Sequence, residues 1–186
     1  MSEIVDASAN ASYEVLPACS VHAGKWYALQ TVPRHEKAVG TQLQLDGLDV
    51  FVPTFRKESK WSDRSKLLDL PIFPGYAFLR SSDISLDRKY IYRSRSVVRL
   101  LSGSAGPAEI PEQEILAVRR ATQGGAAVEP VPYLNVGQRV RIKNGALQGL
   151  EGALVKLGRD NCLVISVDLI QRSISIRIQG YEIEPV

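Results

Sequence analysis

The chain has 186 residues, of which 45% are hydrophobic and 23% charged, and its formal net charge is +3. This composition excludes a chain that is disordered throughout, because such chains lack the apolar residues that a core requires. No apolar run approaches the roughly 18 residues of a membrane-spanning helix, and two cysteines are too few for a disulfide framework or a zinc site.

The first two thirds of the chain alternate short strands with two helices. Residues 1–24 show no regular period and are interpreted as a flexible tail. Helical spacing of apolar residues predicts one helix that begins at Pro33 and ends at Gly47, and a second over 111–121. Together these elements predict an α+β domain over 25–121. Short apolar or aromatic runs predict strands, and one polar segment predicts an exposed loop or hairpin tip: strands at 26–29, 50–52, 67–70, 76–79 and 97–101, and the polar segment at 54–66.

The last third of the chain has a different pattern. Residues 122–134 combine glycines, prolines and small side chains, which is typical of a linker. Beyond it, residues 135–186 contain short β-rich runs that predict a small β-barrel domain. These runs are 138–142, 150–156, 161–167, 173–178 and 181–185.

Catalytic chemistry has little support in this sequence. There are two histidines: His22 lies in the predicted tail, and His35 lies beside Arg34 on the first predicted helix. No glycine-rich phosphate loop occurs, and two acids, Glu112 and Glu114, suit the start of a helix better than a paired-carboxylate site. We therefore expect a protein that is not an enzyme and has no cofactor or metal. With no secretory signal in the sequence, we expect it in the cytoplasm and not at a membrane.

Positive charge is concentrated in the predicted α+β domain. Residues 25–121 hold 16 Lys and Arg against 11 Asp and Glu, and residues 88–99 hold five cations and no acid. Tyr90 and Tyr92 lie among these cations, and arginine with tyrosine is a combination that binds phosphates and unstacked bases. The pattern favours nucleic-acid binding over the alternative of a solvated helix.

An aromatic turn precedes the strand at 76–79. Prolines and Gly75 fix the turn, and Tyr76 and Phe78 share one face of the strand. On the residues alone, this face is either part of the core or an anchor for a partner, with the core favoured.

Taken in order, these segments resemble the NusG family of bacterial transcription elongation factors. The motifs are KWYALQT (25–31), IFPGYAFL (72–79), VVRLL (97–101), EIPEQEI (109–115) and VGQRVRIKNGALQGLEGALV (136–155), the last similar to a KOW motif. The resemblance implies an N-terminal NusG-type domain with an antiparallel sheet and flanking helices, followed by an SH3-like barrel.

The resemblance also implies three sets of contact residues. The pocket that grips the clamp helices of the largest catalytic subunit of RNA polymerase corresponds to Phe73, Tyr76 and Phe78. The face toward upstream or non-template DNA, with nascent RNA as an alternative, corresponds to Arg34, His35, Lys37, Arg93, Arg95 and Arg99. The KOW surface that meets a ribosomal protein or Rho in relatives corresponds to Leu147, Leu150, Leu169, Ile170 and Arg172.

Other features resemble a specialised branch, the UpxY-like antiterminators, which act on particular operons. These features are WSDRSK (61–66), RHEK (34–37) and EIEPV (182–186). The resemblance thus implies a monomeric elongation and antitermination factor that binds polymerase and recruits a second factor through its KOW domain. The alternative is an RNA-binding or ribosome-associated KOW module. We expect strands rather than helices at 161–178, where Val, Ile and Ser dominate.

Overall fold

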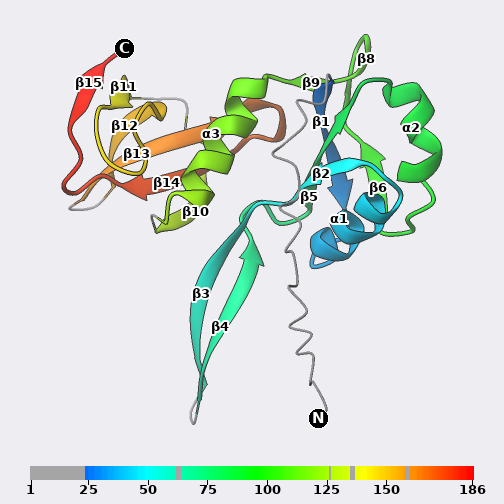
Figure 1. Cartoon of the computed structure of the whole chain (residues 1–186), viewed down its shortest axis with the longest axis horizontal. Coiled ribbons are helices and arrows are strands. Elements are labelled where there is room, and N and C mark those ends of the chain that lie inside the picture. Colours follow the sequence, from blue (N-terminus) through cyan, green and yellow to red (C-terminus); the bar gives the residue numbers. More distant parts are fainter. Residues whose placement is uncertain (1–23, 62–63, 126, 135–136, 158–159) are drawn as a thin grey trace, which may run out of the picture.

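The structure is a computed structural model that describes residues 24–61, 64–125, 127–134, 137–157 and 160–186 (Figure 1). The predicted tail at 1–24 lies outside the described residues except for Gly24. The described residues form two large antiparallel sheets, with helix α3 between them in the view of Figure 1. The chain is a sheet-rich mixed fold of helices and strands, which confirms the expected class at this level.

The first sheet has the strand order β2-β5-β1-β6, and β9 also pairs with β1. Alternation along β1 gives the sheet two buried faces: Tyr27 and Leu29 contribute to one core, and Trp26 and Ala28 to the other. The strands are β1 (Lys25–Thr31), β2 (Asp49–Phe51), β5 (Tyr76–Ser81), β6 (Val97–Leu100) and β9 (Glu109–Ile110). All of their pairings are antiparallel.

Helices α1 (Glu36–Leu45) and α2 (Ile84–Ile91) contribute to the core on the first of these faces. Helix α1 begins three residues after Pro33, the predicted start, because Arg34 has a φ of 71° and cannot be helical. Helix α2 was not among the two predicted helices. Asp83 starts it by accepting hydrogen bonds from the backbone of Ser85 and Leu86.

Strands β3 (Thr54–Trp61) and β4 (Arg64–Pro71) form a hairpin that extends away from both sheets (Figure 1). Their pairing runs from Thr54 opposite Pro71 to Trp61 opposite Arg64. The polar segment predicted at 54–66 is therefore a hairpin arm with a long ladder rather than a short tip. A second, shorter hairpin joins β7 (Ser102–Gly103) and β8 (Gly106–Pro107).

The second sheet lies near the C-terminus and has the strand order β10-β14-β13-β12-β11-β15. Its strands agree with the five predicted runs to within two residues at each end. The sixth strand, β10, lies in the segment predicted as a linker and pairs with β14. The strands are β10 (Val128–Pro132), β11 (Gln138–Ile142), β12 (Glu151–Leu157), β13 (Asp160–Val167), β14 (Arg172–Arg177) and β15 (Ile183–Pro185), with a 3-10 helix, η1 (Asp168–Ile170), between β13 and β14.

Helix α3 (Glu112–Gln123) packs against both sheets. It confirms the helix predicted at 111–121, and its buried residues Ile115, Val118 and Ala121 belong to a core that continues into the second sheet. Glu114 Oε2 accepts a hydrogen bond from the Asp168 N–H at 3.1 Å. The two halves of the chain are thus joined through one helix. No helix among the described residues is long and apolar enough to cross a membrane.

Candidate binding surfaces

The aromatic turn at 73–76 is a tight β-turn. The Tyr76 N–H donates to the Phe73 carbonyl at 3.1 Å, with Pro74 and Gly75 at the central positions. Gly75 has a φ of 84°, which the second central residue of a type II turn requires and which glycine adopts without strain. This geometry fixes the direction in which β5 leaves the turn.

Two of the three residues predicted for the polymerase pocket lie in the core. Phe73 is 1% exposed and Phe78 is fully buried, and their rings meet edge to face with centroids 5.8 Å apart. Tyr76 is half-buried and packs on the same core, so the prediction that Tyr76 and Phe78 share one face of the strand is confirmed. Of the three side chains, only Tyr76 therefore offers appreciable surface to a partner.

Helix α3 covers part of this aromatic face. The Arg119 guanidinium lies 4.8 Å from the centre of the Phe51 ring and 5.5 Å from that of Trp26. Phe51 in turn lies 6.3 Å from Phe78, centre to centre. Arg119 was not among the predicted site residues. Its one signal in the sequence was its place on a helix with an apolar face, from which a long side chain can fold over an aromatic neighbour.

The six predicted nucleic-acid residues are all exposed, and most lie near one edge of the first sheet. Two hydrogen bonds join the loop before α1 to the segment before β6: the Val32 N–H donates to the Ser96 carbonyl, and His35 Nδ1 lies 2.8 Å from Ser96 Oγ. This pairing brings the neighbourhood of Arg34 close to that of Arg95. We call this region, formed by Arg34, His35, Arg95 and Arg99, the basic edge.

The cations near the basic edge differ in their partners. Arg93 forms an ion pair with Asp46, and Arg99 Nε donates to Gln30 Oε1 at 2.7 Å. Lys37 Nζ donates to the Asp69 carbonyl, 2.6 Å away at the base of the β3–β4 hairpin. Among the described residues, Arg34 and Arg95 have no side-chain ion pair or hydrogen bond, so their guanidinium groups keep their full capacity for phosphate.

The predicted KOW surface is largely covered in this structure. Leu147 and Leu150 are each 1% exposed and Ile170 is 5% exposed, whereas Leu169 is half-buried and Arg172 is exposed. Leu147 packs on Gly124 at the end of α3. The 3-10 helix η1, which contains Leu169 and Ile170, begins at Asp168, whose N–H donates to Glu114 of α3. The sequence did not predict that α3 covers this surface, because a glycine such as Gly124 after a helix indicates only that the helix ends there.

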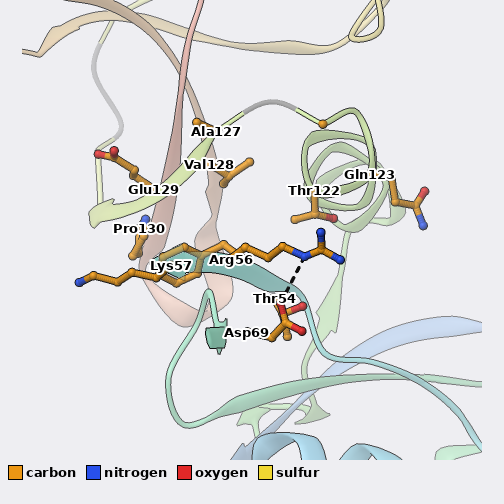
Figure 2. A pocket seen from close by; sticks show the side chains of 12 residues that line it. Thr54, Arg56, Lys57, Asp69, Thr122, Gln123, Ala127, Val128, Glu129 and Pro130 are labelled. Carbon is orange, nitrogen blue, oxygen red and sulfur yellow. Dashed lines mark ion pairs between the residues drawn. The ribbon is translucent and has the colours of Figure 1, made fainter. Parts of the chain in front are cut away.

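A cleft of about 1060 Å³ opens where the base of the hairpin faces the end of α3 and strand β10 (Figure 2). Arg56 extends from the hairpin toward the end of α3 and pairs with Asp69, its neighbour on the opposite strand of the hairpin, at 3.6 Å. Lys57 and Glu129 add one charge of each sign to the lining. Since the lining charges balance and the side chains of the Arg56–Asp69 pair are more than half exposed, the cleft shows no preference for a charged ligand.

The described residues offer no metal-binding cluster. No group of three or more His, Cys, Asp or Glu lies close enough in that part of the chain to hold a metal ion. Burial raises the pKa of the Cys162 thiol, and the charge of Asp160 adds to this shift, so the reactive thiolate is disfavoured.

Comparison with known proteins finds one matching family and several similar proteins. A family model described as transcription termination factor nusG matches residues 24–119, which is more than half of the chain. The transcription termination/antitermination protein NusG of Lactococcus lactis is 25% identical over 176 residues, covering 87% of this chain and 92% of that protein. The protein of the same name from Borreliella burgdorferi is 24% identical over 180 residues, covering 87% and 98%.

The fold of this chain is similar to that of a solved structure. The structure described as domain interaction in Thermotoga maritima NusG superposes with a TM-score of 0.52 at 16% sequence identity. The superposition covers 87% of this chain and 97% of that one. At this identity the likeness shows the fold alone.

Proposed function

The chain belongs to the NusG family, and from this premise we propose that it is a non-enzymatic transcription factor that binds RNA polymerase and suppresses pausing or termination. The observation that carries the proposal is the family match over residues 24–119, the segment that holds both the aromatic turn and the basic edge. Relatives that align over most of their length are named termination/antitermination proteins. We place its action in the cytoplasm, where bacterial transcription takes place.

We assign polymerase binding to residues 25–121. Tyr76 is the contact residue, and Phe73 and Phe78 support it from the core. The partner is the pair of clamp helices of the largest polymerase subunit. A factor that binds the active form of the enzyme more tightly than the paused form shifts the equilibrium toward elongation.

We assign nucleic-acid contact to the basic edge. Arg34 and Arg95 can contact phosphates of upstream or non-template DNA, with His35 and Arg99 beside them. About three phosphate contacts give a log–log salt slope of roughly −2 to −3. Lys37 and Arg93 contribute charge from positions already engaged by Asp69 and Asp46.

We assign recruitment of a second factor to the C-terminal sheet over 135–186, as an SH3-like KOW domain. The partner is a ribosomal protein or Rho, and Leu169 and Arg172 are the contact residues with the most exposed surface. The similarity to UpxY-like antiterminators favours a role on particular operons. Because α3 packs on Leu147 and beside η1, the partner and α3 compete for part of this surface.

A paused-transcription assay tests the proposal. The full chain is added to bacterial RNA polymerase halted at a defined pause, and the lifetime of the pause is measured. The proposal predicts a shorter pause with the wild-type chain and a smaller effect with Tyr76→Ala. A pause lifetime that is unchanged by saturating wild-type chain contradicts it.

The second candidate is an RNA-binding or ribosome-associated module. The exposed cations of α2, Arg88 and Lys89, are the observation that favours it, because they lie outside the ion pairs of the described residues. This candidate predicts tight binding to RNA hairpins without affinity for polymerase. Binding of both ligands supports the first proposal, with nascent RNA as a further contact.

A further inference from the structure

Glu36 is the first residue of α1 and is only 1% exposed. An acid at a helix start interacts favourably with the helix dipole, and it does so from an exposed position as well. Glutamate is almost never fully buried unless it is paired. The burial of Glu36 therefore requires a reason beyond the helix dipole.

The carboxylate of Glu36 joins two segments that are far apart in the chain. Its Oε1 accepts a hydrogen bond from the Gly75 N–H at 2.6 Å and another from the Arg34 N–H at 3.1 Å. Hydrogen bonds to an ionised carboxylate are shorter and about twice as strong as neutral ones. One oxygen atom thus ties the aromatic turn to the loop before α1.

Both donors are held in place by neighbouring groups. Arg34 has a φ of 71°, a left-handed conformation that is unfavourable for a residue with a Cβ. Such a conformation persists only where neighbouring groups hold it. Gly75 is hydrogen-bonded through both of its backbone polar groups: its N–H donates to Glu36, and its carbonyl accepts from the Thr31 N–H at 2.8 Å.

The arrangement carries a cost that stability alone does not explain. Among the described residues, Glu36 Oε2 and Thr31 Oγ1 are both buried without a hydrogen-bond partner. Buried polar groups that lack a partner are rare and destabilising. Glu36 thus has one oxygen that is buried without a partner and one that sets the position of the groups it binds.

Each end of this link leads to a candidate binding surface. Gly75 immediately precedes Tyr76, the polymerase contact, and Arg34 belongs to the basic edge. We propose that Glu36 is a positioning residue that fixes the aromatic turn and the basic edge relative to each other, so that one substitution weakens binding to both polymerase and DNA. This inference rests on the proposed function and assigns Glu36 a part in it.

Two substitutions separate positioning from a simple helix-start effect. Glu36→Asp keeps the charge and suits a helix start, but its shorter side chain cannot reach both N–H groups. Glu36→Gln keeps the length and removes the charge. Glu112→Asp is the matched control, because Glu112 also begins a helix and is exposed.

The experiment measures the affinity of the full chain for RNA polymerase and, separately, for a DNA duplex at low salt. Amide NMR spectra of the same variants report on the Gly75 and Arg34 N–H groups. We expect Glu36→Asp and Glu36→Gln to lower both affinities about five- to tenfold, with both amide signals moving upfield as their hydrogen bonds weaken. The Glu112→Asp control should leave both affinities within twofold of wild type.

Combining substitutions shows whether Glu36 acts through the turn. In a Tyr76→Ala chain, Glu36→Asp should cause little further loss of polymerase affinity. The inference is overturned if Glu36→Asp lowers polymerase affinity as much in the Tyr76→Ala chain as in wild type. It is also overturned if the Glu36 variants keep wild-type affinities although their amide signals have moved. Either result leaves the proposed function standing. If Tyr76→Ala by itself leaves polymerase binding intact, the assignment of Tyr76 as the polymerase contact fails and the inference falls with it. If Glu36→Gln does not fold, Glu36→Asp alone gives the same comparison.

Discussion

Gly124 marks the point where α3 meets the C-terminal sheet, and Gly124→Ala should weaken that contact. An added Cβ would overlap Leu147 Cδ2 and lie 3.4 Å from Leu147 Cγ and 3.1 Å from the Arg120 carbonyl oxygen. Leu147 is 1% exposed and has little room to move. Gly124 has a φ of −73°, so alanine introduces no backbone strain.

The expected loss of docking, meaning the packing of the C-terminal sheet on α3, can be estimated from the cost of overpacking. An extra methyl group in a packed site costs about 1–3 kcal/mol, which lowers the docking equilibrium roughly 5- to 150-fold. Alanine also favours the helix by up to about 1 kcal/mol over glycine. That gain is the same whether or not the C-terminal sheet is docked on α3, so it cancels from the docking equilibrium.

NMR relaxation of backbone amides measures docking directly, because two docked halves tumble together and two released halves tumble faster. We expect faster tumbling of the C-terminal sheet in Gly124→Ala. Gly103→Ala is the matched control, since nothing lies within 4 Å of its Cβ position. Equal tumbling in wild type, Gly124→Ala and the control would refute the packing of Leu147 on α3.

Three further predictions concern the core, the helix contact and the basic edge. Phe78→Ala should reduce the free energy of unfolding by about 3–5 kcal/mol in urea denaturation, because Phe78 is fully buried against Phe51 and Phe73; a loss below about 1 kcal/mol would contradict its place in the core. Burial raises the pKa of the Glu114 carboxyl group; the hydrogen bond from the Asp168 N–H opposes this shift, and the charge of Asp168 adds to it. The protonated acid is therefore favoured when the C-terminal sheet is docked on α3, so docking should strengthen as the pH falls from the raised pKa toward the ordinary 4.5. Glu114→Gln should remove that dependence in the same relaxation measurement, and an unchanged pH profile would count against it. Replacing Arg34 and Arg95 together by alanine should reduce the magnitude of the salt slope of DNA binding by about 2, and an unaltered slope would exclude them as phosphate contacts.

Strands with strict alternation could be predicted from the sequence, and elements without an apolar face could not. The run at 173–178 alternates and is found as β14 at 172–177. Helix α2 buries only Ile91, so it left no periodic signal, and the Asp83 cap was its one local sign. Strand β10 was hidden by Pro130 and Pro132, which read as linker residues. Two prolines at alternate positions are compatible with an edge strand, where both missing N–H groups can face away from the partner.

The candidate surfaces were predicted to different degrees for physical reasons. Residue types and spacing located the aromatic turn and the two basic clusters at 34–37 and 88–99, because each of these features is local in sequence. The links between them are not local: Glu36 and Gly75 are 39 positions apart, and Ser96 is 61 positions from His35. Coverage of Leu147 by α3 likewise depends on tertiary packing, which a sequence pattern does not specify.

Binding of bacterial RNA polymerase by the full chain, compared with Tyr76→Ala, tests the central claim most directly. Tyr90→Ala is the matched control, since Tyr90 is also half-buried but lies on α2. The account predicts that wild type and Tyr90→Ala retain polymerase while a folded Tyr76→Ala chain loses most of its affinity. Equal retention of polymerase by Tyr76→Ala and wild type, or no retention by any of the three folded chains, would contradict it.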